Sequence, residues 1–252
     1  MMVIIKTDKE IEKIKKSCQL AANTLKFVSE KVKPGLKTEK LDQIAEYFIK
    51  KQGGLPSFKG YGPKGNEFPA SICVSINDEI VHGIPGDRIL EEGDIVSIDI
   101  GTNLNGYFGD IAATFGVGTI NDIAKKLIKT TQACLFDGIK KAIEGNFIGD
   151  IGYAIQSRAE FNHFSVVREY VGHGVGLQVH EDPQIPNYGK PKTGLKLERG
   201  MVIAIEPMVN EGDYKTVSDV NGWTVKTADG SLSAHFEHTI AIYEERNDIL
   251  TN

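Results

Sequence analysis

An Asn-Gly pair joins two long apolar segments near the middle of this chain and dictates how they meet. Asn105-Gly106 is the strongest short-range signal for a two-residue β-hairpin, because both turn positions need a positive φ angle. The sequence therefore predicts antiparallel strands over residues 94–104 and 107–116. The turn also predicts the register, with Leu104 opposite Tyr107.

This register places two carboxylates on one face of the hairpin. Asp99 would lie opposite Ala112 and Asp110 opposite Gly101, so the two aspartates become diagonal neighbours roughly 7–8 Å apart. An unpaired charge inside such an apolar run is costly. Carboxylates at this spacing can bind one cation or an adjacent pair of cations through ~2 Å bonds. The alternative is that one Asp pairs with a Lys or caps a turn while the other faces solvent.

A chain of 252 residues can form one large α/β or α+β domain or two small ones, and the internal repeat described below favours a single domain over residues 1–252. With 40% hydrophobic and 25% charged residues, the chain can bury a sizeable core. A formal net charge of −5 argues against nucleic-acid binding as the main activity. No apolar run approaches the ~20 residues of a membrane span, and the apolar run at the N-terminus is too short for a secretory signal. We therefore expect a cytoplasmic protein without membrane contact.

The three cysteines predict neither a disulfide framework nor a zinc ribbon. Cys18, Cys73 and Cys134 are widely scattered and form no CxxC pair. We expect reduced thiols.

Two helices followed by strands occur twice along the chain. Thr7 and Glu10 form a capping box for the first helix, and Thr38 is the predicted cap of the second. The predicted helices are 8–32, 38–51, 121–143 and 149–161, and the further predicted strands are 70–76, 165–172, 201–209 and 234–243.

The repetition is also visible in the residues themselves. LEEGDIVSID at 90–99 matches LERGMVIAIE at 197–206, with Leu, Gly, Ile and the final acid in step. The period is far longer than that of a solenoid, so we expect two pseudo-symmetric halves of one domain. Asp99 then corresponds to Glu206, a third carboxylate at the end of a buried strand.

Two more side chains complete a possible metal site. Glu237 comes just before an alternating apolar strand, and His173 stands between glycines in VGHGVG. Four carboxylates without counter-charge would repel one another strongly in a low-dielectric site. Four carboxylates and one imidazole suit two divalent ions, with Asp110 and Glu237 as natural bridges, and such a centre is usually hydrolytic.

These residues lie in segments that resemble type I methionine aminopeptidases. The resemblance extends from Ile4 to Tyr243, and it is clearest in CVSINDEIVHGIPGDRILEEGDIVSIDIGTNLNGYFGD, EYVGHGVGLQVHEDPQIPNYG, GMVIAIEPMV and DGSLSAHFEHTIAI. It implies the α+β pita-bread fold, with two helix–strand halves around a dinuclear site. It assigns one ion to Asp99, Asp110 and Glu237, and the other to Asp110, His173, Glu206 and Glu237.

The resemblance also implies catalytic roles near the metals. His82 and His180 match the substrate-side histidines, which contact the scissile peptide or stabilise its developing charge. A hydroxide bridging the two ions would attack the first peptide carbonyl, and Glu206 is the candidate for proton shuttling. His163 and His238 are interpreted as surface or hydrogen-bonded histidines, and His235 receives no role.

A substrate pocket and a further cation site follow from the same comparison. The methionine pocket would draw on Phe58, Tyr61, Phe68, Cys73, Val179 and Trp223, a mostly apolar lining that suits a thioether. Residues 61–73 are longer than the usual bacterial pattern, and Val179 stands where an aromatic residue is common. Asn77 and Ser233 match the positions that hold a monovalent cation near the hairpin.

The implied substrate is the initiator methionine of new chains, released when the second residue is small. Nascent N-termini, transient meetings with ribosomes and a monomeric state are therefore expected. Co²⁺, Mn²⁺, Fe²⁺ and Zn²⁺ all suit the mixed ligand set. We expect no direct, sequence-specific binding of nucleic acid.

Three competing interpretations remain. An Xaa-Pro dipeptidase or aminopeptidase shares the fold, but this chain leaves no room for the extra N-terminal domain of those enzymes. A binding module of the same fold would have lost its metal ligands, whereas all five are present here. Metal storage without catalysis is disfavoured by the apolar pocket and the paired histidines.

Overall fold

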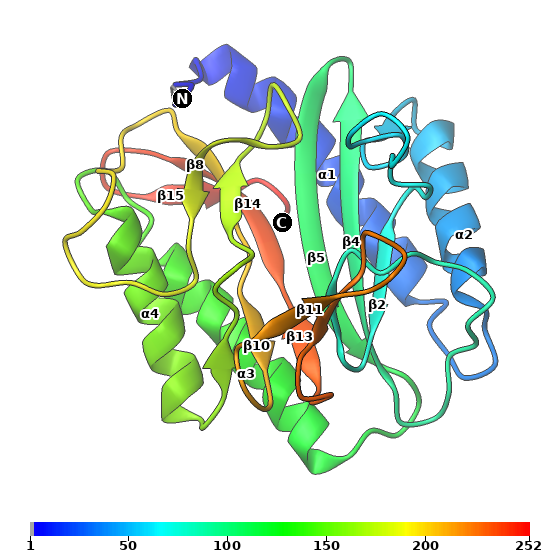
Figure 1. Cartoon of the computed structure of the whole chain (residues 1–252). Helices are drawn as coiled ribbons and strands as arrows, with labels where there is room; N and C mark the ends of the chain where they lie inside the picture. The colour runs from blue at the N-terminus through cyan, green and yellow to red at the C-terminus, as the bar shows by residue number, and fades with distance from the viewer. Residues whose placement is uncertain (1–2) are drawn as a thin grey trace.

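Two pairs of helices cover one side of a central nine-stranded sheet. The computed structural model describes residues 3–252. The helices are α1 (Asp8–Ser29), α2 (Thr38–Lys51), α3 (Asp122–Ile139) and α4 (Ile148–Phe161). In Figure 1, α1 and α2 accompany β4 (Ile95–Leu104) and β5 (Tyr107–Gly116), whereas α3 and α4 lie on the side of β14 (Glu237–Ile242).

The strands form one large sheet and two small ones. The large sheet runs in the order β1-β4-β5-β14-β9-β7-β8, with β2 paired to β4 and β15 to β14. The small sheets have the orders β13-β10-β6 and β11-β12-β3. The remaining strands are β1 (Leu55–Pro56), β2 (Cys73–Ile76), β3 (Glu79–Val81), β6 (Ser165–Val166), β7 (Gly172–Gly174), β8 (Glu181–Ile185), β9 (Val202–Ile205), β10 (Met208–Asn210), β11 (Thr216–Ser218), β12 (Val225–Thr227), β13 (Ser233–His235) and β15 (Asn247–Ile249).

The predicted hairpin is confirmed residue by residue. Leu104 pairs with Tyr107, Asp99 with Ala112 and Asp110 with Gly101. Asn105 and Gly106 have φ angles of 55° and 82°, the left-handed values that a two-residue turn requires. The turn chemistry therefore places both aspartates as predicted.

The first helix begins at its predicted cap, but the second does not. The Thr7 hydroxyl accepts a bond from the Glu10 backbone N–H, and the Glu10 carboxylate accepts one from the Thr7 N–H, which completes the capping box. The cap residue of α2 is Lys37, without a side-chain bond, so the prediction for Thr38 is wrong. The Thr38 hydroxyl instead donates to the Gly86 carbonyl and accepts from the Gly86 N–H, joining the helix to a distant loop.

Three predicted strands are interrupted where the chain leaves one sheet for another. The 201–209 segment is divided into β9 and β10 by Glu206-Pro207, and the 234–243 segment is divided into β13 and β14 at Phe236. Proline has no backbone N–H to donate to a neighbouring strand, so the hydrogen bonding of the 201–209 segment is expected to break at Pro207. The 165–172 segment forms only β6 and the start of β7.

Each half of the molecule has its own hydrophobic core. One core joins α1 and α2 to β2 and β4, with Leu41 and Ile98 fully buried in it. The other joins α3 and α4 to β9 and β14, with Ile151 and Ile203 fully buried. This arrangement matches the pseudo-symmetry predicted from the repeat. Within residues 3–252, no helix is both long enough and apolar enough to cross a membrane.

Candidate metal centre

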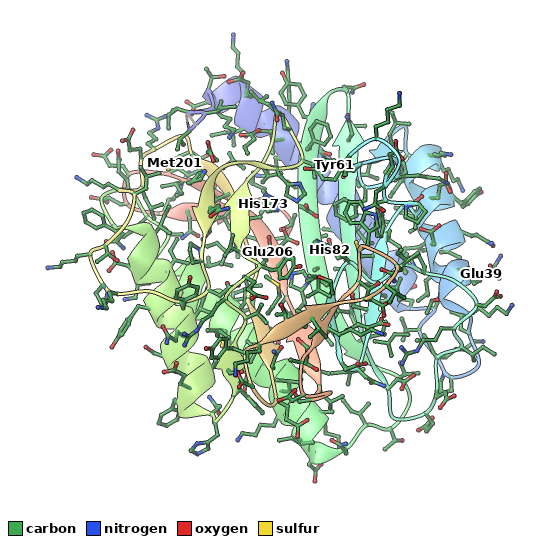
Figure 2. The ribbon with its side chains drawn as sticks, viewed as in Figure 1. Glu39, Tyr61, His82, His173, Met201 and Glu206 are labelled. Carbon is green, nitrogen blue, oxygen red and sulfur yellow. The ribbon has the colours of Figure 1, made fainter. Side chains whose placement is uncertain are left out.

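The five predicted metal ligands come together on the face of the large sheet opposite the helices. Asp99 lies on β4, Asp110 on β5, His173 on β7 and Glu237 at the start of β14, while Glu206 directly follows β9. Figure 2 shows His173, Glu206 and His82 gathered over the middle of the sheet, far from Glu39 on α2. All five ligands line one cavity of about 670 Å³.

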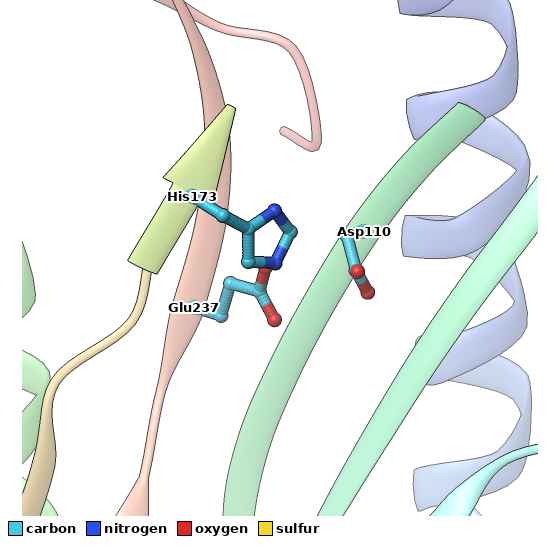
Figure 3. A group of neighbouring side chains, drawn as sticks. All are labelled: Asp110, His173 and Glu237. Carbon is cyan, nitrogen blue, oxygen red and sulfur yellow. The ribbon is translucent and has the colours of Figure 1, made fainter. Parts of the chain in front are cut away.

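Three of these side chains are already close enough to share a cation. One ligand atom each from Asp110, His173 and Glu237 lies within 4.8 Å of the others. Figure 3 shows their side chains converging from three strands of the large sheet, β5, β7 and β14. Because residues of three separate strands supply the ligands, the sheet itself fixes their spacing.

Glu206 lies between two imidazoles. Its Oε1 is 3.3 Å from His173 Nε2, and its Oε2 is 3.5 Å from His235 Nε2. His235 is buried, and its Nε2 has no hydrogen-bond partner. Sequence reasoning gave His235 no role, although residues 235 and 237 are two apart and strand alternation would have placed them on one face.

The carboxylates have an environment that disfavours negative charge. Burial, followed by the charge of Glu206, raises the pKa of Asp110 to about 8, and burial raises the pKa of Glu206 to about 8. Burial and the neighbouring carboxylates also raise the pKa values of Asp99 and Glu237 well above the ordinary range. These raised pKa values belong to the metal-free protein, and bound cations would lower them.

Three carboxylate oxygens in the cavity lack hydrogen-bond partners, which indicates that the site binds a cation. Asp99 Oδ1, Asp110 Oδ1 and Glu237 Oε1 are buried without a hydrogen-bond partner. Buried oxygens without partners are costly in folded proteins, and a divalent cation satisfies them. The donor set of hard carboxylates and one imidazole fits Mn²⁺, Fe²⁺, Co²⁺ or Zn²⁺. Neither aspartate behaves as the exposed or capping residue of the alternative interpretation.

The His173 ring is oriented by the backbone. Its Nδ1 is 2.9 Å from the carbonyl oxygen of Gly174. A carbonyl can only accept, so Nδ1 carries the proton and Nε2 keeps its lone pair toward the carboxylates. Burial lowers the pKa of His173 to about 3, which keeps the ring neutral and able to bind a metal.

The two predicted substrate-side histidines border the same cavity from different segments. His82 has a φ angle of 58°, and burial lowers its pKa to about 4. Its ring makes edge contacts with Tyr170 and Trp223. His180 lies at the mouth of the cavity, where its Nδ1 is 2.7 Å from the Tyr61 hydroxyl and its ring centroid is 4.3 Å from that of His173.

The residues predicted to bind methionine form one apolar cluster beside the carboxylates. Val179 and Cys73 are buried in it together with Phe58 and Phe68, and Trp223 packs against it. Tyr61 borders the cavity as well. The structure therefore brings all six predicted side chains together beside the carboxylates, including those from the unusually long 61–73 segment.

The other residues named from the sequence lie outside the cavity, apart from Cys73 in its lining. Asn77 and Ser233 are adjacent, since the Ser233 N–H donates to the Asn77 carbonyl at 2.8 Å. The His238 Nδ1 is 2.8 Å from the Thr251 hydroxyl, as expected for a hydrogen-bonded histidine, and His163 is exposed. The thiols of Cys18, Cys73 and Cys134 are free, as predicted.

Known proteins share this fold and sequence over the full length of the chain. The profile of Metallopeptidase family M24 matches residues 12–244. Methionine aminopeptidase 1 from Bacillus subtilis is 54% identical over 250 residues, which is 99% of each chain. The crystal structure of methionine aminopeptidase from Rickettsia prowazekii superposes with a TM-score of 0.96 at 44% identity and full coverage of both chains. Prolidase from Pyrococcus furiosus gives a TM-score of 0.78 at 25% identity, but this chain covers only 65% of it.

Proposed function

This chain belongs to metallopeptidase family M24, and we propose that it removes the initiator methionine from newly made polypeptides whose second residue is small. It is a metal-dependent hydrolase with the activity of a methionine aminopeptidase. Relatives that are 54% and 52% identical to it in sequence carry that name. The observation that supports this most directly is a buried carboxylate–histidine cluster beside an apolar pocket, in a chain that matches such relatives from end to end.

Two divalent ions would be held by side chains of both halves of the molecule. Asp99, Asp110 and Glu237 would bind one ion, and Asp110, His173, Glu206 and Glu237 would bind the other. The unpaired oxygens on Asp99, Asp110 and Glu237 support this assignment. Divalent ions at such a site supply Lewis-acid polarisation of a carbonyl and make water acidic enough to act as a nucleophile near neutral pH.

The protein side chains then move protons and stabilise charge. Glu206 accepts a proton from the attacking water and returns it to the departing amine, since its carboxylate lies inside the cavity. His82 and His180 contact the scissile peptide and stabilise the oxyanion that develops on its carbonyl. The Tyr61 hydroxyl fixes the orientation of the His180 ring.

The apolar cluster would bind the methionine side chain. Phe58, Phe68, Cys73, Val179 and Trp223 offer an apolar wall, and Tyr61 borders it at the cavity mouth. An unbranched thioether fills such an irregular pocket well. Exclusion of water from this region also strengthens the electrostatic interactions at the adjacent carboxylates.

Several finer assignments belong to this proposal. Asn77 and Ser233 would hold a monovalent cation through their backbone carbonyls, as their adjacency permits. Nascent N-termini are the proposed substrates. Transient contact with ribosomes, a monomeric state and a cytoplasmic location stay predictions from the sequence.

The experiment is methionine release by metal-reconstituted protein from two matched peptides. We expect rapid release from Met-Ala-Ser and little from Met-Lys-Ser, because the larger second residue is excluded. Asp110→Asn removes a ligand shared by both proposed ions and should abolish release. If none of the four metals supports release from either peptide, the metal-poor binding module becomes the better interpretation. Preferential cleavage of an Xaa-Pro peptide would favour the prolidase-like alternative.

A further inference from the structure

A buried ion pair connects the start of the chain to the segment that contains His180. Lys6 Nζ lies 2.5 Å from Glu181 Oε2, and the two side chains are only 1% and 2% exposed. Neither residue belongs to the proposed metal ligands or to the methionine pocket. The two are separated by 175 positions in the sequence, so the contact forms only in the folded protein.

The second oxygen of Glu181 holds the backbone of the same segment. Glu181 Oε1 accepts the N–H of Leu177 at 2.6 Å and the N–H of Gln178 at 2.9 Å. We call residues 176–181 the His180 loop. One carboxylate thus ties the beginning of this loop to its end, directly beside His180.

The His180 loop is also seated on the first helix and on the hairpin. A Cβ added to Gly176 would come within 2.5 Å of Ile14 Cδ1, and the Lys6 side chain lies next to the same glycine. The Phe108 N–H donates to the Gly176 carbonyl at 2.8 Å. Lys6 itself is held by a backbone bond to Gly200, also 2.8 Å long. Lys6 is therefore a fixed point from which the loop can be positioned.

Stability alone does not account for this arrangement. A buried ion pair loses hydration on both partners, and an apolar pair of similar volume is often equally stable or more stable. What the charged pair adds is direction, because the carboxylate must point at one ammonium and two N–H groups at once. The residue next to that carboxylate is His180.

We infer that Lys6 is a positioning residue for catalysis, which acts through Glu181 to hold His180 over the scissile peptide. The inference rests on the proposed function, since the role of His180 toward the peptide belongs to it. Without Lys6, the Glu181 carboxylate keeps its two backbone bonds within the loop but loses its ion pair with the start of the chain. His180 then samples positions away from the developing oxyanion, and misplacement of about 1 Å can cost roughly a hundredfold in rate.

The test compares Lys6→Met with Lys13→Met, which removes an exposed lysine of α1 that contacts Tyr107. With Met-Ala-Ser, Lys6→Met should lower kcat roughly ten- to a hundredfold and change KM about twofold at most. Lys13→Met should leave both values unchanged. In a His180→Ala background, Lys6→Met should lower kcat no more than about twofold further, because the side chain through which it acts is already gone.

A double variant separates positioning from folding. Lys6→Met with Glu181→Gln removes both charges while the amide oxygen can still accept the Leu177 and Gln178 N–H groups, so no unpaired buried carboxylate remains and its Tm should lie close to that of the wild type. Its kcat should nevertheless stay low. Full kcat in this variant, or an equal loss from Lys6→Met with and without His180, would overturn the inference.

A measurement independent of activity keeps the two proposals apart. The imidazole nitrogen signals of His180, assigned by their loss in His180→Ala, should shift in Lys6→Met and not in Lys13→Met. If the wild type releases no methionine while these signals shift, the proposed function fails although the loop is anchored as described. Unchanged signals in an active Lys6→Met protein would refute the positioning role alone.

Discussion

Asp110 shows at the level of one residue why this cavity calls for a cation. It is buried on β5, one of its oxygens has no partner, and burial with the charge of Glu206 raises its pKa to about 8. In a protein without a ligand for it, such a group is a net cost to stability. The same features make it a suitable bridge between two divalent ions.

Tyr61 offers a test of a single hydrogen bond. In Tyr61→Phe the ring remains in the pocket but the contact with His180 Nδ1 is lost, so the imidazole is less well oriented. We expect kcat for Met-Ala-Ser to fall about tenfold with a small change in KM, as is usual for residues that orient a catalytic group. Steady-state kinetics measure both values.

The control for this prediction is Tyr47→Phe. Tyr47 lies on α2 and is 63% exposed, so its hydroxyl has no part in the cavity. Equal kcat values for Tyr61→Phe and wild type would show that the His180 ring is held without the phenol.

At the level of elements, the hairpin depends on very close contact with the first helix. An added Cβ at Gly109 on β5 would lie 2.5 Å from the backbone nitrogen of Cys18 on α1 and 2.6 Å from its Cα. Only a residue without a side chain allows the helix to approach the strand this closely. The same strand supplies Asp110, so the packing of α1 supports the geometry of the site.

Gly109→Ala should therefore be strongly destabilising. The new methyl group meets helix backbone, which cannot move aside without shifting α1, and overpacking of this kind costs about 3 kcal/mol of unfolding free energy. Urea unfolding of the purified variants measures this value. Gly86→Ala is the control, because its Cβ would meet no atom within 4 Å. Equal unfolding free energies for the two variants would show that α1 can shift away from the added methyl group at little cost in free energy.

Local chemistry explains which elements could be predicted from the sequence. The hairpin register followed from Asn105-Gly106, and the start of α1 followed from Thr7 and Glu10, because both signals act within a few residues. The switch of sheets at Glu206-Pro207 and the short pairings of β3, β11 and β12 depend on distant partners. Thr38 was assigned to the wrong role for the same reason, since its partner Gly86 is 48 positions away.

At the level of the whole molecule, the two halves contribute different ligands to one site. Asp99 and Asp110 come from the first half, and His173, Glu206 and Glu237 come from the second. The internal repeat predicted that Asp99 and Glu206 are equivalent, and the structure brings them into one cavity. The Lys6–Glu181 pair was not predicted, because its contact appears only when the two halves are packed together. His235 contacts Glu206 within the second half, and its position two residues before Glu237 is the signal that would have found it.

The charge of the assembled site predicts how the metal-free protein responds to pH. The folded-state pKa values of Asp110 and Glu206 are raised to about 8, above their unfolded values, so the stability they contribute at low pH is lost as pH rises toward 8. The buried histidines act oppositely, since the pKa of His173 is lowered to about 3 and that of His82 to about 4, but their effect is confined to pH values below about 6.5.

Between pH 6.5 and 8.5 the carboxylates alone should therefore govern stability. We expect the Tm of the metal-free protein to fall across this window, and to fall less in Asp110→Asn, which has one fewer proton to lose. Saturating Mn²⁺ should remove the decline, because it binds the deprotonated ligands. Differential scanning fluorimetry at several pH values measures each case, and a flat Tm without metal would contradict the electrostatic account.

Isothermal titration of the metal-free protein with Mn²⁺ tests the central claim that these five side chains form a two-ion centre. The account predicts two ions for each chain of the wild type. His173→Ala, which alters a ligand of one proposed ion only, should reduce this to one tightly bound ion, while Asp110→Asn should weaken both. Binding of fewer than two ions to the wild type, or two equally tight ions in His173→Ala, would contradict the proposed centre.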